Sequence, residues 1–81
     1  MKQIIVYSRK NCHLCHEAES ILKELEGELP ITWEKRDIDE DDRLIELYDW
    51  YVPVIELEGR ILQSGKIVKE MLKKQLMVEI G

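Results

Sequence analysis

The chain has 81 residues, of which 44% are hydrophobic and 36% are charged, and its formal net charge is −5. This length predicts one domain over residues 1–81, and the composition is typical of a folded chain. The negative charge disfavours nucleic acid and anionic membrane surfaces, because both need a basic face. With no run long enough for a transmembrane helix or a signal peptide, the sequence predicts a cytoplasmic protein, and we expect a monomer.

The predicted elements begin with a strand. Residues 3–7 form a short apolar run of the kind found in a buried central strand. From Cys12 onward the apolar residues are spaced as on one face of a helix, which Gly27 and Pro30 should end. Residues 31–39 start with alternating polarity and become heavily charged, which predicts an exposed edge strand.

The second half of the chain predicts two more helices and a hairpin. Asp39 is the expected N-cap of a helix whose apolar side consists of Leu44, Ile45, Leu47 and Tyr48. Residues 53–57 predict a strand that turns at Glu58-Gly59 into residues 60–63. Ser64 is the expected cap of a last helix with an inner face of Ile67, Val68, Met71, Leu72 and Leu76. The resulting order, β-α-β-α-β-β-α, predicts an α/β fold with a four-stranded mixed sheet and helices on both faces.

The most informative motif is Cys12-His13-Leu14-Cys15-His16, which fits three patterns. A Cys-x-x-Cys pair can be a redox dithiol, and Cys-x-x-Cys-His can attach a c-type haem. The haem interpretation needs an exported protein and a pocket for a porphyrin. Zinc bound by Cys12, Cys15 and His16 would lack a fourth ligand elsewhere, because the chain has only two Cys and two His. The dithiol is therefore preferred, with a metal-binding or redox-regulatory module without turnover as the alternative.

The position of the dithiol at the start of a helix explains how it would react. A thiolate is the attacking species, and unpaired N–H groups in the first helical turn stabilise negative charge. We expect the pKa of Cys12 to fall moderately below about 8.5, with Arg9, Lys10 and protonated His13 adding positive charge. Cys15 lies one turn further along the helix and should be the more buried sulfur.

The segments "VYSRKNCHLCHEA", "DIDED" and "VPVIELEG" resemble short bacterial and archaeal glutaredoxin-like proteins, and the likeness covers nearly the whole chain. This resemblance implies a minimal thioredoxin fold and a glutaredoxin- or thioredoxin-like protein disulfide reductase. Cys12 would attack a substrate disulfide and Cys15 would resolve the mixed disulfide. No bound cofactor or metal is implied; the redox group is a reversible Cys12–Cys15 disulfide.

The resemblance also implies a substrate groove. In thioredoxin-like proteins the proline matching Pro53 is cis and lies beside the Cys pair, and the residue before it pairs with an extended substrate. Val52 would then hold the substrate by main-chain hydrogen bonds, and Trp50 and Tyr51 would frame the groove. The expected substrate-binding residues are Arg9, His13, Leu14, Tyr51, Val52, Pro53 and Gly65.

The electron donor is left open by two departures from the family pattern. Familiar glutaredoxins carry Cys-Pro-Tyr-Cys, and they hold glutathione with Gly-Gly and a following Asp ahead of the last helix. Here the middle pair is His13-Leu14, and Ser64-Gly65-Lys66 keeps the glycine without the Asp. We expect a disulfide-containing protein or a small thiol as substrate, and either a reductase or, less favoured, glutathione as donor.

Overall fold

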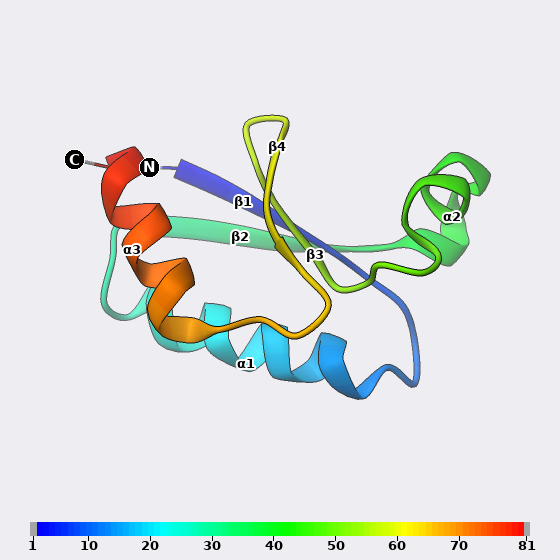
Figure 1. The fold of residues 1–81 in the computed structure, drawn as a ribbon, viewed down its shortest axis with the longest axis horizontal. Helices are drawn as coiled ribbons and strands as arrows, with labels where there is room; N and C mark the ends of the chain where they lie inside the picture. Colours follow the sequence, from blue (N-terminus) through cyan, green and yellow to red (C-terminus); the bar gives the residue numbers. More distant parts are fainter. Residues whose placement is uncertain (1, 81) are drawn as a thin grey trace.

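The computed structural model describes residues 2–80 and has the predicted order of elements (Figure 1). A single-turn 3-10 helix, η1, is added between the second strand and the second helix. The elements are β1 (Lys2–Ser8), α1 (His13–Glu26), β2 (Ile31–Asp37), η1 (Ile38–Glu40), α2 (Asp42–Tyr48), β3 (Val54–Leu57), β4 (Arg60–Ser64) and α3 (Lys69–Ile80). Within residues 2–80 no helix has the length and apolar character needed to cross a membrane.

The four strands form one mixed sheet in the order β2-β1-β3-β4. β1 runs parallel to β2 and antiparallel to β3, so that Ile4 lies opposite both Trp33 and Leu57. β3 and β4 form the predicted hairpin, whose turn residues Glu58 and Gly59 both have positive φ. The predicted topology is confirmed, because the β1-α1-β2 crossover makes the first two strands parallel.

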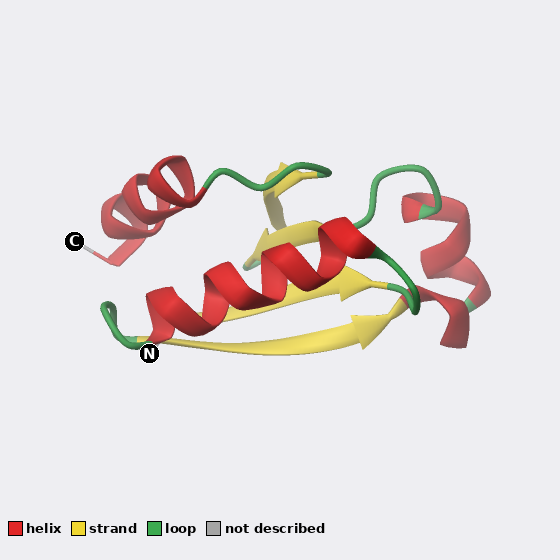
Figure 2. Cartoon of the chain, turned by 90° about the horizontal axis from the view of Figure 1, so that it is seen from below, coloured by secondary structure: helices red, strands yellow, loops and turns green. Residues whose placement is uncertain are grey.

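The two faces of the sheet are covered by different helices (Figure 2). Ile4 and Val6 of β1 point to one face, where α1 and α3 build the larger core, while Ile5 and Tyr7 point to the other. On that second face α2 and η1 cover only the end of the sheet at which β1 and β2 finish. The larger core contains Ile4, Val6, Ala18, Leu22, Leu25, Ile31, Ile55, Leu57, Ile67, Leu72 and Leu76.

The smaller core is organised around Tyr7. Its ring stacks on Tyr48 of α2 with the centroids 4.7 Å apart, and its hydroxyl donates a hydrogen bond to Glu56 at 2.6 Å. Burial, reinforced by the hydrogen bond to Glu56, raises the pKa of Tyr7 to about 12. Tyr7 therefore keeps its proton throughout the neutral range and ties β1 to both α2 and β3.

The structure corrects the prediction for the second helix. The strand predicted over residues 31–39 ends at Asp37, whose carboxylate accepts the backbone N–H of Asp39 and starts η1. Asp39 is not the N-cap of α2; that position belongs to Asp41, which accepts the N–H of Arg43 at 2.8 Å. Leu47, which the spacing places on the apolar side of this helix, is 58% exposed, because the side of α2 that faces the smaller core carries Leu44, Ile45 and Tyr48, and Leu47 lies beside it.

The last helix also starts later than predicted. Ser64 is the final residue of β4 and caps no helix, and α3 begins only at Lys69. The side chain of Gln63 instead bonds both backbone groups of Val68, accepting its N–H at 2.9 Å and donating to its carbonyl at 3.2 Å. With this later start, Val68 and Met71 are about half exposed rather than internal.

Candidate functional site

The two cysteines lie at the start of α1 and form a disulfide, with their Cα atoms 5.2 Å apart. Cys12 is the N-cap residue of this helix, and its Sγ accepts the backbone N–H of Cys15 at 3.2 Å. An N–H that already points at this sulfur is placed to stabilise a negative charge on it. The sequence prediction of a dithiol at a helix start therefore holds, with Cys12 preceding the first helical residue.

The two sulfurs differ in their access to solvent. Cys12 is partly exposed, whereas Cys15 is 0% exposed and lies on the buried side of α1, one turn before Ala18. This confirms that Cys15 is the more buried residue of the pair. A disulfide or an alkylating reagent arriving from solvent therefore meets Cys12 first.

Alkylation of the reduced protein tests this difference in access. We expect iodoacetamide at limiting concentration and neutral pH to modify Cys12 before Cys15, because only Cys12 is open to the reagent and its thiolate has an N–H to stabilise it. Peptide mass mapping of a time course measures the order. Equal labelling in denaturant is the control, and labelling of Cys15 first in the folded protein would contradict the geometry.

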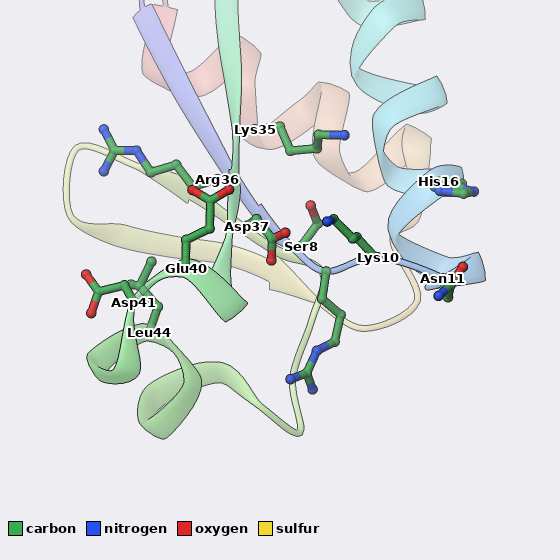
Figure 3. A pocket seen from close by; sticks show the side chains of 11 residues that line it. Ser8, Lys10, Asn11, His16, Lys35, Arg36, Asp37, Glu40, Asp41 and Leu44 are labelled. Carbon is green, nitrogen blue, oxygen red and sulfur yellow. The ribbon is translucent and has the colours of Figure 1, made fainter.

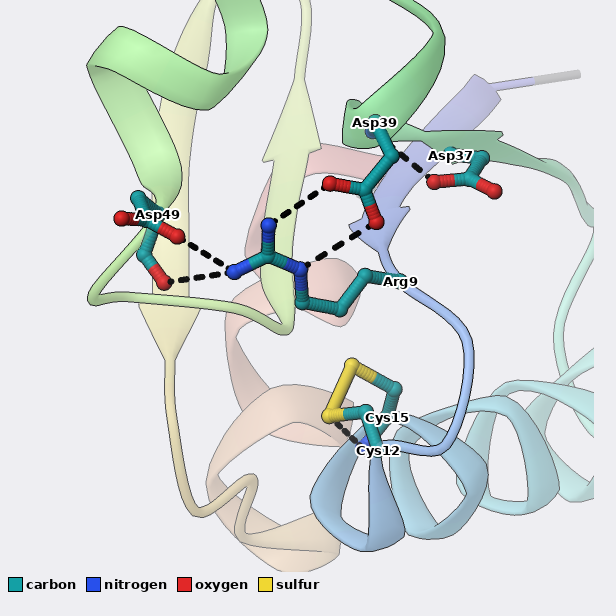
Figure 4. A network of polar contacts seen from close by, with 6 residues as sticks. All are labelled: Arg9, Cys12, Cys15, Asp37, Asp39 and Asp49. Atoms are coloured by element: carbon teal, nitrogen blue, oxygen red, sulfur yellow. Dashed lines mark hydrogen bonds and ion pairs between the residues drawn. A yellow bond between two sulfur atoms is a disulfide. The ribbon is translucent and has the colours of Figure 1, made fainter.

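Arg9 precedes the dithiol but is held by two carboxylates (Figure 4). Its guanidinium makes a two-pronged contact with Asp39 of η1, at 2.6 and 3.3 Å, and also pairs with the carboxylate of Asp49 at the end of α2. Hydrogen bonds to Asp39 and then to Asp49 raise the pKa of Arg9. The positive charge that Arg9 was expected to place beside Cys12 is thus neutralised, and Arg9 fastens the dithiol loop to α2.

Sequence reasoning missed both partners of Arg9. Asp39 and Asp49 are separated from Arg9 by 30 and 40 positions, respectively, and no local pattern connects them. The only available signal was the density of acidic residues after β2, which predicted helix capping rather than an ion pair. We call the group of Arg9, Asp39 and Asp49 the arginine clamp.

The arginine clamp predicts a pH dependence of stability. The hydrogen bond from Arg9 lowers the pKa of Asp39. A carboxyl whose folded pKa lies below its unfolded value of about 3.9 stabilises the fold above that value, and this stabilisation is lost as the pH falls through the folded pKa. We expect the free energy of unfolding to decrease below about pH 4, and to decrease less steeply in Asp39→Asn.

Urea unfolding followed by circular dichroism at a series of acidic pH values measures this dependence. Glu46→Gln is the matched control, because Glu46 lies on the exposed side of α2 and forms no ion pair among residues 2–80. The control should follow the native protein over the whole acid range. A pH dependence of Asp39→Asn that is parallel to that of the native protein would show that the clamp is not responsible.

The residues between the cysteines lie on an open surface. His13 has a side chain that is 88% exposed and lies 3.9 Å from Glu17, while Leu14 is partly buried. The same Glu17 carboxylate also pairs with Lys66 at 3.5 Å, so the basic residue after Gly65 is held against α1. The surface around the dithiol therefore carries little uncompensated positive charge from Arg9 or Lys66.

The segment linking α2 to β3 lies beside the start of α1 in both views of the chain (Figures 1 and 2). The Val52–Pro53 peptide bond is cis, and Gly65, at φ 72°, donates its N–H to the carbonyls of Tyr51 and Pro53. The N–H of Val52 already donates to Tyr48 at 3.2 Å. Among the described residues no hydrogen bond is accepted by the carbonyl of Val52, which leaves this group available to a partner.

A groove of about 840 Å³ opens on the other side of the dithiol loop, where β1 and β2 end (Figure 3). Basic side chains, among them Lys10 and Lys35, share its walls with the acidic Asp37 and Glu40. Neither cysteine is among the residues that line it. The mixed charge is typical of a solvated surface, and the groove does not open onto the Cys pair.

Over residues 2–80, no three His, Cys, Asp or Glu side chains converge closely enough to hold one metal ion. His16, the third zinc ligand considered from the sequence, is exposed and lines the groove rather than the dithiol. Of the three zinc ligands considered, Cys12 and Cys15 are joined in a disulfide and His16 faces the groove.

Comparison with known proteins gives a family and a fold. Residues 3–77 match the family model described as a glutaredoxin-like domain (DUF836). Target protein XcR50 from X. campestris is 28% identical, with a TM-score of 0.80 over 93% of this chain and 96% of that one. Protein Ne2328 from Nitrosomonas europaea is also 28% identical, with a TM-score of 0.80 over 91% and 89%.

A more distant neighbour supports the fold alone. Thioredoxin from Trypanosoma brucei brucei is 18% identical, with a TM-score of 0.67 over 99% of this chain and 75% of that one. The comparison with curated proteins gives no significant match.

Proposed function

Because the chain belongs to the glutaredoxin-like domain family, we propose that it is a thiol-disulfide oxidoreductase that reduces disulfides by dithiol exchange through Cys12 and Cys15. The observation that carries the proposal is the asymmetry of the pair at the start of α1. Cys12 is reachable and accepts a helix N–H, whereas Cys15 is buried directly behind it. One sulfur is thus suited to attack a partner and the other to resolve the product.

The exchange proceeds in two displacements. The Cys12 thiolate attacks one sulfur of the partner disulfide, that S–S bond breaks, and the departing thiolate takes up a proton from water. Cys15 then loses its proton and attacks the Cys12 sulfur, which forms the Cys12–Cys15 disulfide and releases the second partner thiol. The partner gains the two electrons and two protons that the Cys pair loses.

The substrate would lie along the segment that joins α2 to β3. The carbonyl of Val52 is available to accept an N–H from an extended chain, as in the addition of a strand to a sheet edge. The N–H of Val52 contributes only if its bond to Tyr48 opens. His13 and Leu14 would contact the substrate from the opposite side of Cys12.

The arginine clamp favours a protein dithiol reductase over glutathione as the electron donor. A small anionic thiol needs cations near Cys12 to hold its carboxylates, and Arg9, one of the two basic residues just before Cys12, is already engaged by Asp39 and Asp49. A reductase docks over a larger surface and does not depend on one cation. We assign the activity to the cytoplasm, whose reducing systems keep such a dithiol reduced.

Two coupled assays test the proposal. The oxidised protein is supplied with hydroxyethyl disulfide as a neutral substrate, and NADPH consumption is followed with thioredoxin reductase or with glutathione and its reductase. We expect turnover with thioredoxin reductase and a rate near background with glutathione. Turnover with glutathione alone would overturn the choice of donor, and no turnover with either would overturn the proposed activity.

A further inference from the structure

An exposed apolar face lies at the end of α2, directly before the cis Val52–Pro53 bond, and takes no part in the core. Trp50 is 89% exposed, and Leu47 and Tyr51 are 58% and 59% exposed. Single exposed apolar side chains are common on protein surfaces, but a contiguous group of them marks an interaction site. We call these three side chains the apolar face.

The three side chains are brought together by the end of α2. Backbone hydrogen bonds from Tyr51 and Val52 to the carbonyl of Tyr48 continue the helical turn beyond the last helical residue. Residues spaced by three and four therefore lie on the same side. The neighbouring side of α2 carries Leu44, Ile45 and Tyr48 into the smaller core. The apolar face is thus an outward surface that the fold leaves uncovered.

The surroundings of the apolar face determine the charge of its occupant. Between residues 37 and 50 the chain carries seven acidic side chains and a single basic one, Arg43. Arg9 compensates Asp39 and Asp49, and the exposed Arg43 lies one helical turn before Leu47. Exposed acidic residues such as Asp42 and Glu46 still outnumber this one cation along α2. Glu46 lies one helical turn before Trp50. A ligand that covers the apolar face must approach through this negative potential, which attracts cations and repels anions.

We propose that the apolar face docks a polypeptide that carries basic residues beside its disulfide, and this proposal, which rests on the proposed function, names the substrate class of that function. Apolar side chains of the polypeptide cover Trp50, Tyr51 and Leu47, and its Lys or Arg residues meet the acidic side of α2. Because Tyr51 is followed directly by Val52, the docked chain continues toward the free carbonyl and the start of α1.

A second copy of this chain fits the apolar face less well. Each copy has a net charge of −5, and its apolar face has acidic neighbours, so two such faces would bring like charges together. A small anionic thiol such as glutathione meets the same repulsion without the apolar side chains that would offset it. A polypeptide with both apolar and basic side chains complements the apolar face and the acidic residues around it.

Binding to the oxidised protein tests docking separately from catalysis. Two short peptides share an apolar centre and a serine in place of cysteine, and their flanking residues are either lysines or glutamates. Each peptide is titrated into isotope-labelled protein, and the Trp50 indole signal gives the dissociation constant. We expect the lysine peptide to bind about tenfold more tightly at low ionic strength, and the difference to shrink in high salt.

Charge reversals at matched positions locate the effect. Glu46 lies beside the apolar face, so Glu46→Lys should reduce or invert the preference for the lysine peptide over the glutamate peptide. Glu26→Lys makes the same change in net charge at the far end of α1 and should leave the preference unchanged. Equal binding of both peptides, or signals that shift on the exposed Met71 and Val78 of α3 instead, would overturn the proposal. Concentration-dependent shifts without peptide would overturn it in favour of a second copy.

Catalysis is then measured with cysteine versions of the peptides, activated as neutral pyridyl disulfides. A preference in binding without any turnover would refute the proposed function and leave the docking site standing. Turnover of hydroxyethyl disulfide with no preference between the peptides would refute the docking site and leave the proposed function standing. The two failures are therefore distinguishable.

Discussion

Cys12→Ser is expected to abolish disulfide exchange, lowering the rate with hydroxyethyl disulfide on the order of a thousandfold or more. A hydroxyl stays protonated where a thiol can ionise, so the N–H that Cys15 directs at this position has no anion to stabilise. Because Cys12 is partly exposed and lies before the first residue of α1, serine should leave the fold intact. The coupled assay measures the loss, and circular dichroism checks the fold.

Cys15→Ser is the variant matched to Cys12→Ser, and we expect it to trap an intermediate and not only to lose activity. Cys12 can still attack, but no second thiol is present to displace the substrate, so a mixed disulfide accumulates. Non-reducing electrophoresis and intact mass measure the trapped species, which dithiothreitol should release. Equal loss of activity in both variants without a trapped adduct would mean that the roles assigned to the exposed and the buried sulfur are wrong.

The parts of the site that the sequence predicts are those carried by local signals. The start of α1 follows from the position of the Cys pair between an apolar run and a helical spacing, and its end follows from Gly27, which is the C-cap. The hairpin follows from Glu58-Gly59 in the same way. Each of these features is decided by residues within one or two turns of chain, so the sequence alone contains the information.

The features that the sequence does not predict depend on contacts between distant segments. Asp39 and Asp41 are equally good N-cap residues by type, but in the fold Asp39 pairs with Arg9 from a distant segment, and Asp41 caps the helix. The late start of α3 likewise depends on Gln63 of β4, which bonds Val68 from outside the helix. Local preference assigned these caps wrongly because tertiary contacts outweighed it.

The chemistry proposed for Cys12 depends on how firmly α1 is held to the sheet. The sulfur receives its N–H from the first turn of this helix, while the helix is anchored by side chains in its later turns, Ala18, Leu22 and Leu25, all of which are 0% exposed. The segment that links α2 to β3, along which we propose that the substrate lies, is anchored separately, through Gly65 and the start of β3. The two halves of the site keep their positions only while α1 stays packed on β1.

Leu22→Ala is therefore expected to destabilise the protein by about 2–5 kcal/mol, the usual cost of emptying a fully buried leucine site. A domain of this size has a free energy of unfolding of only about 5–15 kcal/mol, so the loss is a large part of the total. Leu47→Ala removes the same atoms from an exposed site and should change stability by less than about 0.5 kcal/mol. Urea unfolding of the three proteins measures the difference. If both variants lost the same stability, α1 would not be held by the larger core, and the dithiol would need another anchor.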